Sequence, residues 1–461
     1  MGTARSGTLQ PKEGPLVSMA IGLNGRGIDV GGRNAGITLF RRGVLLLITS
    51  IAIQALLWSP PAGAAAVRLA YLDANPHRAV AQALKETFEA SQLDVQLDLV
   101  PVSESQAMAM IFQWLATGEI ADVFYLPVEW VGSLKGNRLL LPLDTLRWPG
   151  APLVDLFGQF PPGIQIAFAE GRAPIGIPLT ASASVFLYNE RLLADAGLPN
   201  LDEFSREWNW YDLIDIGRRV AAPAQNRYML DVDLEFTAVY FMVHGDVVTP
   251  DGMNSNILNE ANVRILELAR EAIYQHRISP APPQQSGAQR RFSSQQLAMH
   301  KIGIENLHPS RLAQTQAQIP FGWNIALWPR SPFTGARPAF GFGAGLVVAW
   351  GARSLPDVSR LLDFAARPET QLAVAQRAGV IPAAPAALAG VWTGTSSAAA
   401  AAAQVLADWQ FLTFPVVFVE DVESLLDPVQ AVLNNTMEPQ AALERVHLRF
   451  QEYLDSVYRN R

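Results

Sequence analysis

From Val67 onward, short apolar runs alternate with stretches in which apolar residues recur every three or four positions. Three such runs in the first half predict the strands Val67–Tyr71, Val95–Val102 and Ala121–Tyr125. Between the first two, Ala79–Ala90 has the apolar spacing of an amphipathic helix. Ser103 begins a Ser-x-x-Gln capping box, which predicts a second helix that ends at Gly118.

Strands that alternate with helices imply right-handed crossovers and a parallel sheet. In such sheets, ligands bind beyond the carboxyl ends of the strands, where loops and helix N-termini converge. The loops that we expect to face a ligand are therefore Asp73–His77 and Leu126–Val131.

The second half of the chain continues the alternation with more helix. Its pattern predicts strands at Val185–Tyr188 and Leu346–Trp350, and helices at Glu190–Ala196, Trp208–Val220, Ala261–Tyr274, Val358–Ala366, Thr370–Ala378 and Gln440–Tyr458. The run Ala398–Ala403 predicts the start of a further helix through Phe411, because Ala has the highest helix propensity. Ser279–Gln289, rich in Pro and Gln, predicts an exposed loop.

The N-terminal region has the order of a secretory signal peptide. Arg41 and Arg42 precede the apolar run Val44–Trp58, and the small residues Ala62–Ala66 follow it. The run spans 15 residues, fewer than the roughly 20 that a transmembrane helix needs. We therefore expect residues 1–66 to be a leader and signal peptide, with an uncleaved anchor as the alternative.

Composition excludes several classes of protein. A length of 461 residues, 49% of them hydrophobic, exceeds what one hydrophobic core usually serves, so two domains or lobes are expected. The absence of Cys excludes disulfide scaffolds, thiolate metal sites, thiol nucleophiles and lipid attachment at an N-terminal Cys. A net charge of -7 provides no basic surface for nucleic acid.

Motifs of catalysis and of cofactor binding are also missing. The chain has no Walker loop, His-Glu-x-x-His, Gly-x-Ser-x-Gly or EF-hand pattern, and its six His are scattered. Gly341–Gly345 superficially resembles a dinucleotide fingerprint but precedes a predicted strand, whereas the fingerprint follows one. We therefore assign no catalytic residue, no metal ligand and no cofactor. Carboxylates are plentiful, yet nothing selects a glycosidase-like acid/base pair.

A set of ordered segments carries a family resemblance. These segments are Leu115–Val123, Leu139–Asp144, Gly176–Pro178, Leu187–Glu190, Ala196–Leu198, Trp208–Leu213, Phe292–Ser294, Leu297–Met299, Gly343–Trp350 and Gly379–Pro382. In this order and spacing the chain resembles the extracellular solute-binding proteins of carbohydrate ABC importers, the maltose-binding-like family.

The resemblance implies a periplasmic-binding-protein fold: two α/β lobes whose chain crosses repeatedly at a hinge, with the ligand in the cleft between them. Lobe one is then Val67–Ile177 plus Thr334–Ile381, and lobe two is Pro178–Phe333 plus the C-terminal helices of Pro382–Arg461.

The same resemblance implies a monomeric periplasmic protein that captures a sugar or oligosaccharide by hinge closure and delivers it to membrane ABC permease subunits. It implies no enzymatic activity, no cofactor and no nucleic-acid partner. One alternative is a sensor or adaptor that presents its ligand to a membrane receptor. Another is a secreted carbohydrate-active enzyme.

Sugar sites combine aromatic faces, which stack on the ring, with polar groups that bind hydroxyls. On the family pattern, Asp73 and Asn75 follow the first strand, where a helix cap is the alternative role. Glu129 and Trp130 follow the third strand and otherwise belong to a surface helix turn.

Further ligand contacts are expected near the hinge and in lobe two. They are Thr180 and Ser182 after Gly-Ile-Pro, Glu235 and Phe236 in a polar and aromatic loop, Glu305 where relatives carry a stacking Trp, Trp323 at the return crossover, and Gly341, Phe342 and Gly343 in a glycine-rich loop. Hinge hydrogen bonding is the alternative for Thr180 and Ser182, and packing is the alternative for Trp323. Glu305 could accept hydroxyl or cationic donors. The glycines let backbone N–H groups approach a ligand.

Overall fold

The computed structural model describes residues 65–91, 94–103, 109–111, 113–114, 121–135, 139–146, 153–245, 247–249, 253–339, 341–392, 396–409 and 426–458. All of them belong to one compact unit, Ala64–Arg461. The predicted signal-peptide run Val44–Trp58 lies outside the described residues, as does most of the helix predicted after Ser103.

A mixed sheet organises the chain, with the strand order β2-β1-β3-β9-β6-β7. β1 (Ala65–Leu72) lies between β2 (Val95–Val102) and β3 (Val123–Pro127) and runs parallel to both. β9 (Gly341–Val348) is antiparallel to β3, and β6 (Gly176–Asn189) is antiparallel to β9. The predicted parallel sheet is therefore wrong beyond β3, because β9 enters the sheet from a distant part of the chain in the opposite direction.

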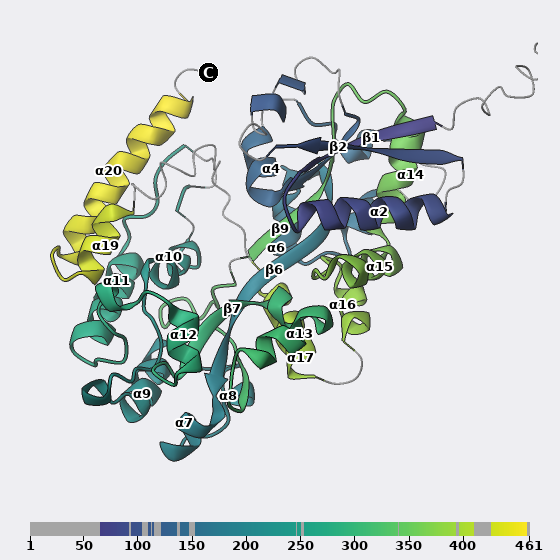
Figure 1. Ribbon diagram of the computed structural model, residues 1–461. Coiled ribbons are helices and arrows are strands. Elements are labelled where there is room, and N and C mark those ends of the chain that lie inside the picture. The colour runs from purple at the N-terminus through teal and green to yellow at the C-terminus, as the bar shows by residue number, and fades with distance from the viewer. Residues whose placement is uncertain are drawn as a thin grey trace, which may run out of the picture. The chain divides into compact units, whose positions relative to one another are not determined.

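The strand β6 connects two regions of the molecule (Figure 1). Its first half pairs with β9, and its second half pairs with β7 (Met299–Gly303) and β8 (Trp323–Ala326). The first lobe contains β1, β2, β3 and β9, and the second lobe lies around β7 and β8. β6 is thus a continuous strand shared by both.

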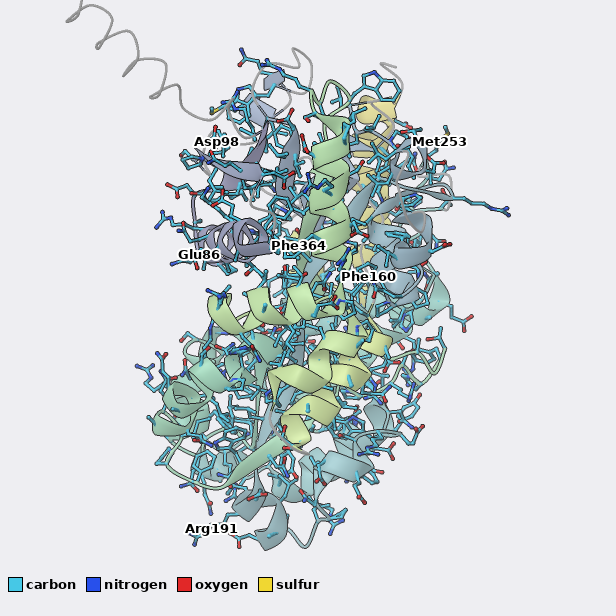
Figure 2. All side chains as sticks on the ribbon, turned by 90° about the vertical axis from the view of Figure 1, so that its right-hand side faces the viewer. Glu86, Asp98, Phe160, Arg191, Met253 and Phe364 are labelled. Carbon is cyan, nitrogen blue, oxygen red and sulfur yellow. The ribbon has the colours of Figure 1, made fainter. Side chains whose placement is uncertain are left out.

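Helices α2 (His77–Ser91), α14 (Leu355–Ala366) and α15 (Pro368–Ala378) pack together beside the first-lobe strands. The rings of Phe88 and Phe364 meet edge to face at a centroid distance of 5.4 Å, and Figure 2 labels Phe364 close to α2. Arg377 of α15 forms an ion pair of 3.2 Å with Glu86 of α2. The apolar faces predicted for these helices are therefore buried against one another and the sheet.

The remaining helices of the described residues are shorter or belong to the second lobe. They are α4 (Val128–Leu134), α5 (Leu153–Phe157), α6 (Pro162–Ala167), α7 (Glu190–Asp195), α8 (Leu201–Phe204), α9 (Trp210–Val220), α10 (Leu234–Met242), α11 (Glu260–Tyr274), α12 (Ala288–Ser293), α13 (Pro309–Ala317), α16 (Pro385–Val391), α17 (Ser397–Ala407), α19 (Asp427–Leu433) and α20 (Pro439–Tyr458). Single 3₁₀ turns occur at Leu143–Thr145, Pro223–Gln225, Pro282–Gln284 and Ile304–Leu307, and a small hairpin pairs β4 (Ala169–Glu170) with β5 (Ala173–Pro174).

Local side-chain chemistry sets where individual helices begin. The side chain of Asn209 accepts hydrogen bonds from the backbone N–H groups of Tyr211 and Asp212, and Asp212 accepts one from the N–H of Asn209. This reciprocal capping box starts α9 at Trp210, two residues after the predicted start.

Buried apolar side chains form two clusters: the first contains the core of the first lobe and also second-lobe residues such as Phe292, Ile304 and Ile325, and the second lies within the second lobe. The second is rich in aromatic rings, with Trp210, Phe236, Tyr240 and Trp328 in mutual contact. α16 and α17 contribute to the first cluster, whereas α19 and α20 contribute to the second. The lobe boundaries stay a prediction, because the first cluster contains side chains from both lobes.

Candidate ligand-binding cleft

A cleft of about 370 Å³ opens along β6 and β9, at the carboxyl ends of β1 and β3. It is lined by Pro76, His77, Tyr125, Pro127, Glu129, Thr180, Ala181, Ser182, Glu305, Arg311, Phe342, Gly343, Ala344, Val380 and Ile381. Both segments that were expected to face a ligand reach it, the first through His77 after β1, and the second through Pro127 at the end of β3 and Glu129 after it. Six of the expected contacts, Glu129, Thr180, Ser182, Glu305, Phe342 and Gly343, lie on its walls.

Hydroxyl groups line one side of the cleft. The hydroxyl of Tyr125 lies 3.0 Å from the Oγ1 of Thr180, in hydrogen-bond contact. Burial raises the pKa of Tyr125, so the phenol stays protonated. The ring of His77, the first residue of α2, meets the ring of Tyr125 edge to face at 5.5 Å.

Phe342 presents an aromatic face beside these polar groups. Its side chain is 58% exposed, although it belongs to β9 and lines the cleft. Ser182 of β6 is its direct cross-strand partner, so the two side chains share one face of the sheet. The arrangement places a stacking surface next to a hydroxyl.

Glu305 is held in place by its neighbours. Its Oε2 accepts a hydrogen bond from the hydroxyl of Ser182, and its Oε1 accepts one of 3.3 Å from the side-chain amide of Asn306. The 3₁₀ turn Ile304–Leu307 carries it directly after β7. Glu305 thereby links β6 to the segment that follows β7.

Glu129 has a different environment, since it is half-buried in the first turn of α4. Desolvation of its carboxyl group raises its pKa to about 7. Near neutral pH this side chain therefore exists in both protonation states, and its protonated form can donate a hydrogen bond into the cleft.

The glycines of β9 have a structural role besides the ligand contact predicted for them. Gly341–Gly345 is the first half of a strand, so the predicted loop is wrong. A Cβ at Gly343 would lie 2.8 Å from the carbonyl oxygen of Thr180, and a Cβ at Gly341 would collide with the indole of Trp409. These glycines allow β9 to approach β6 and Trp409, and Gly341 does not line the cleft.

Comparison with known proteins agrees with this architecture. A family described as bacterial extracellular solute-binding proteins matches residues 83–405. The chain belongs to that family. A binding protein of Brucella abortus (strain 2308) is 20% identical to this solute-binding protein over 353 residues, which cover 75% of this chain and 82% of the relative.

Two solved structures share the fold of this solute-binding protein. The sugar-binding protein MalE from the phytopathogen Xanthomonas citri is 17% identical with a TM-score of 0.69, covering 85% of this chain and 98% of its own. The cyclic alpha-maltosyl-1,6-maltose binding protein from Arthrobacter globiformis is 17% identical with a TM-score of 0.68, and the match covers 86% of this chain and 100% of that chain. The predicted family and the two-lobed α/β fold are confirmed.

Several expected contacts of the solute-binding protein lie away from the cleft walls. Asp73 is exposed and forms an ion pair of 2.7 Å with Arg78, and Asn75 is exposed before Pro76. Trp130 and Trp323 are half-buried against the first apolar cluster. For Trp323 this is the packing role given as its alternative.

Glu235 and Phe236 occupy the first turn of α10, so the loop predicted there is wrong. Asp233 caps this helix by accepting a hydrogen bond of 2.7 Å from the N–H of Phe236. Phe236 is 1% exposed, since its ring packs on Trp210 and Trp328 at 5.1 Å. A ring so buried cannot stack on a ligand in this conformation.

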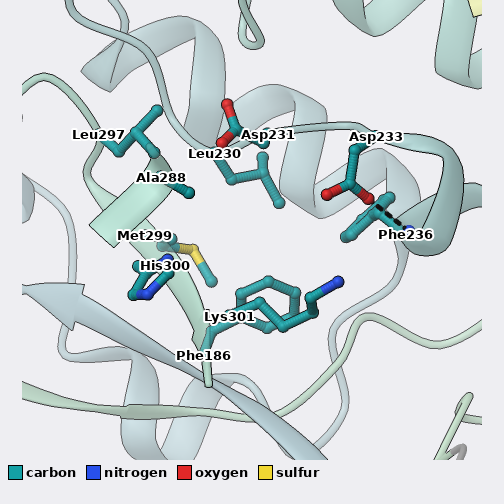
Figure 3. Close-up of a pocket in the computed structure, with 10 residues that line it drawn as sticks. All are labelled: Phe186, Leu230, Asp231, Asp233, Phe236, Ala288, Leu297, Met299, His300 and Lys301. Atoms are coloured by element: carbon teal, nitrogen blue, oxygen red, sulfur yellow. Dashed lines mark hydrogen bonds between the residues drawn. The ribbon is translucent and has the colours of Figure 1, made fainter. Parts of the chain in front are cut away.

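A smaller cavity of about 50 Å³ adjoins this turn, and Figure 3 shows the side chains around it. Asp231 is almost fully buried and forms an ion pair with Arg291, while Lys301 pairs with Glu235 at 2.6 Å. Charges of opposite sign thus neutralise one another at this cavity. Its volume suits a water molecule or two rather than a sugar.

Sequence reasoning missed three polar residues of the main cleft: His77, Tyr125 and Arg311. His77 is the last residue of a loop expected to face a ligand, and Tyr125 is the last residue of a predicted strand. Their positions at strand ends could therefore have identified both residues as candidates. Arg311 lies on α13, which the sequence pattern did not predict.

Among the residues that the structure describes, no helix has both the length and the apolar composition needed to cross a membrane. The same part of the chain brings together no group of three or more His, Asp or Glu side chains that could hold a metal ion.

Proposed function

We propose that the chain is the ligand-capturing component of an ABC importer, which binds a sugar or oligosaccharide and delivers it to the permease. The observation that carries the proposal is the exposed ring of Phe342 next to Ser182 and Glu305 in one cleft. An aromatic face beside hydroxyl and carboxylate acceptors matches the two needs of sugar recognition. MalE of Xanthomonas citri, a sugar-binding protein of the same fold, supports the choice of ligand class.

In this proposal the protein carries out binding and no covalent chemistry. Ligand contacts from both lobes favour a closed conformation over an open one, because a ligand shifts the equilibrium by its difference in affinity for the two states. β6 runs continuously between the lobes and serves as part of the hinge. The closed monomer then docks on the membrane permease. The predicted signal peptide would place it in the periplasm.

Calorimetry with a panel of neutral and charged mono- and oligosaccharides tests the proposal. We expect at least one saccharide to bind, and small-angle scattering to record a smaller radius of gyration for its complex. Failure of the whole panel to bind would count against a sugar-binding role. Binding without compaction would contradict closure, and release of a modified sugar would instead favour an enzyme.

A further inference from the structure

The charged side chains of the cleft differ in whether they have a bonding partner within the protein. Four side chains that can carry a charge near neutral pH line it: His77, Glu129, Glu305 and Arg311. Glu305 uses its two oxygens to accept hydrogen bonds from Ser182 and Asn306. Burial raises the pKa of Glu129 to about 7, which reduces its negative charge at neutral pH. The hydrogen bonds leave the negative charge of Glu305 in place, but neither carboxylate forms an ion pair with the cation of the cleft.

Arg311 is that cation, and its guanidinium has no partner within the described part of the chain. It is half-buried in the first turn of α13. Among the described residues, no carboxylate lies within ion-pair distance of Arg311, and its side chain donates no hydrogen bond. A guanidinium has five N–H donors in a planar fork, which matches the two oxygens of a carboxylate or phosphate.

This lack of a partner sets Arg311 apart from arginines of similar burial. Each of the other buried or half-buried arginines in the described part of the chain contacts a carboxylate or a backbone carbonyl; they are Arg68, Arg227, Arg264, Arg270, Arg291, Arg330, Arg337 and Arg360. Partial burial of an arginine without an anion costs desolvation that a bound ligand can offset.

We propose that the saccharide bound in this cleft carries an anionic group, and that Arg311 binds this group while Phe342 stacks on the sugar ring. The inference rests on the proposed sugar-binding function and narrows its ligand class. The shared chemistry is a sugar unit that bears a carboxylate or a phosphate.

Matched pairs of anionic and neutral ligands test the ligand class by calorimetry. One pair is trigalacturonate and its carboxyl-reduced trimer, and the other is glucose 6-phosphate and glucose. We expect one anionic member to bind about tenfold or more tightly than its neutral partner, since the guanidinium forms charge-assisted hydrogen bonds with the anion. The pair that shows the preference identifies carboxylate or phosphate as the group recognised.

The variant Arg311→Gln should remove this preference, because it weakens binding of the anionic member of the pair about tenfold or more. Arg172→Gln is the matched control, because Arg172 is exposed in the β4–β5 turn and does not line the cleft. The control variant should prefer the anionic ligand by the same factor as the unchanged protein. A thermal melt of each ligand-free variant verifies that it is folded.

The outcomes separate the two proposals. Equal or tighter binding of neutral sugars overturns the anionic ligand class and leaves the sugar-binding function standing. An anionic preference that survives Arg311→Gln overturns the role of Arg311. Absence of binding by the neutral and anionic saccharides alike, here and in the wider panel, overturns both.

Discussion

At the scale of single residues, Glu129 and Glu305 line one cleft but differ in what surrounds them. Two donors hold the carboxylate of Glu305, whereas burial dominates the environment of Glu129. A carboxyl group that is desolvated in the folded protein costs stability once it ionises. The cleft thus contains an acid whose protonation changes near neutral pH.

Glu129→Gln should make the protein more stable at pH 8, by up to about 3 kcal/mol, and should leave stability near pH 4 almost unchanged. The sign follows because the folded-state pKa, about 7, lies above the usual value of 4.5. Folding of the unchanged protein therefore weakens as pH rises from about 4.5 to 7. Urea unfolding at both pH values measures the difference.

The control for this variant is Glu452→Gln, which changes an exposed glutamate on α20. It should not alter the pH dependence. If Glu129→Gln were equally or less stable than the unchanged protein at pH 8, the unfavourable ionisation of Glu129 would be disproved.

Phe342→Leu should weaken saccharide binding by about five- to tenfold, because it removes a stacking face worth roughly 1 kcal/mol or more. Calorimetry with the saccharide identified from the panel provides the measurement. The matched control is Phe204→Leu, an exposed phenylalanine in α8 that is 39% exposed and does not line the cleft. Equal affinities of the two variants would contradict stacking at Phe342.

At the scale of elements, the close approach of β9 to β6 depends on residues without side chains. Gly343 and Gly345 of β9 face the carbonyl oxygens of Thr180 and Ile177 across the strand pair. Side chains at these positions would push the two strands apart. The glycine-rich run therefore maintains the strand pairing that forms one wall of the cleft.

Gly345→Ala should destabilise the protein by about 1–3 kcal/mol, as overpacked core substitutions do. The added Cβ would lie 2.5 Å from the carbonyl oxygen of Ile177 and 2.5 Å from the ring of Phe168. Chemical denaturation measures the loss. Gly158→Ala is the control, since its Cβ would meet its nearest neighbour at 3.5 Å. A loss no larger than that of the control would mean that the strands can separate without cost.

At the scale of the whole molecule, Arg337 connects segments that are far apart in the sequence. Its guanidinium donates to the carbonyl oxygens of Ser205, Arg206 and Trp328 and pairs with Asp408 at 3.2 Å. The Arg337 side chain is 1% exposed. It thereby joins the end of α17, which contributes to the first apolar cluster, to α8 and the segment after β8.

Arg337→Leu should cost about 3–5 kcal/mol of stability, because it leaves three carbonyl groups without their donor and Asp408 without its cationic partner. Differential scanning calorimetry of the ligand-free protein measures the change. Arg172→Leu, at an exposed position, should shift the melting temperature little. A loss below about 1 kcal/mol for Arg337→Leu would show that water replaces the guanidinium at these acceptors.

Some of this protein could be derived from its sequence alone. β2 has the predicted bounds Val95–Val102, and α11 begins one residue before the predicted Ala261. Such elements depend on the spacing of apolar residues and on capping groups, which are local properties. The family and the two-lobed fold could also be predicted, because short segments of the family occur in a characteristic order. The ligand roles of the predicted contact residues remain predictions, even for residues such as Ser182 and Glu305 that lie on the cleft walls.

Only the tertiary structure decided which distant segments meet. The antiparallel entry of β9, the full length of β6 and the burial of Phe236 all depend on contacts between residues far apart in the chain. The same is true of Arg311, whose importance comes from the absence of a carboxylate partner among the described residues. Periodicity determines an element and its buried face, but pairing, burial and charge balance arise from packing across the whole fold.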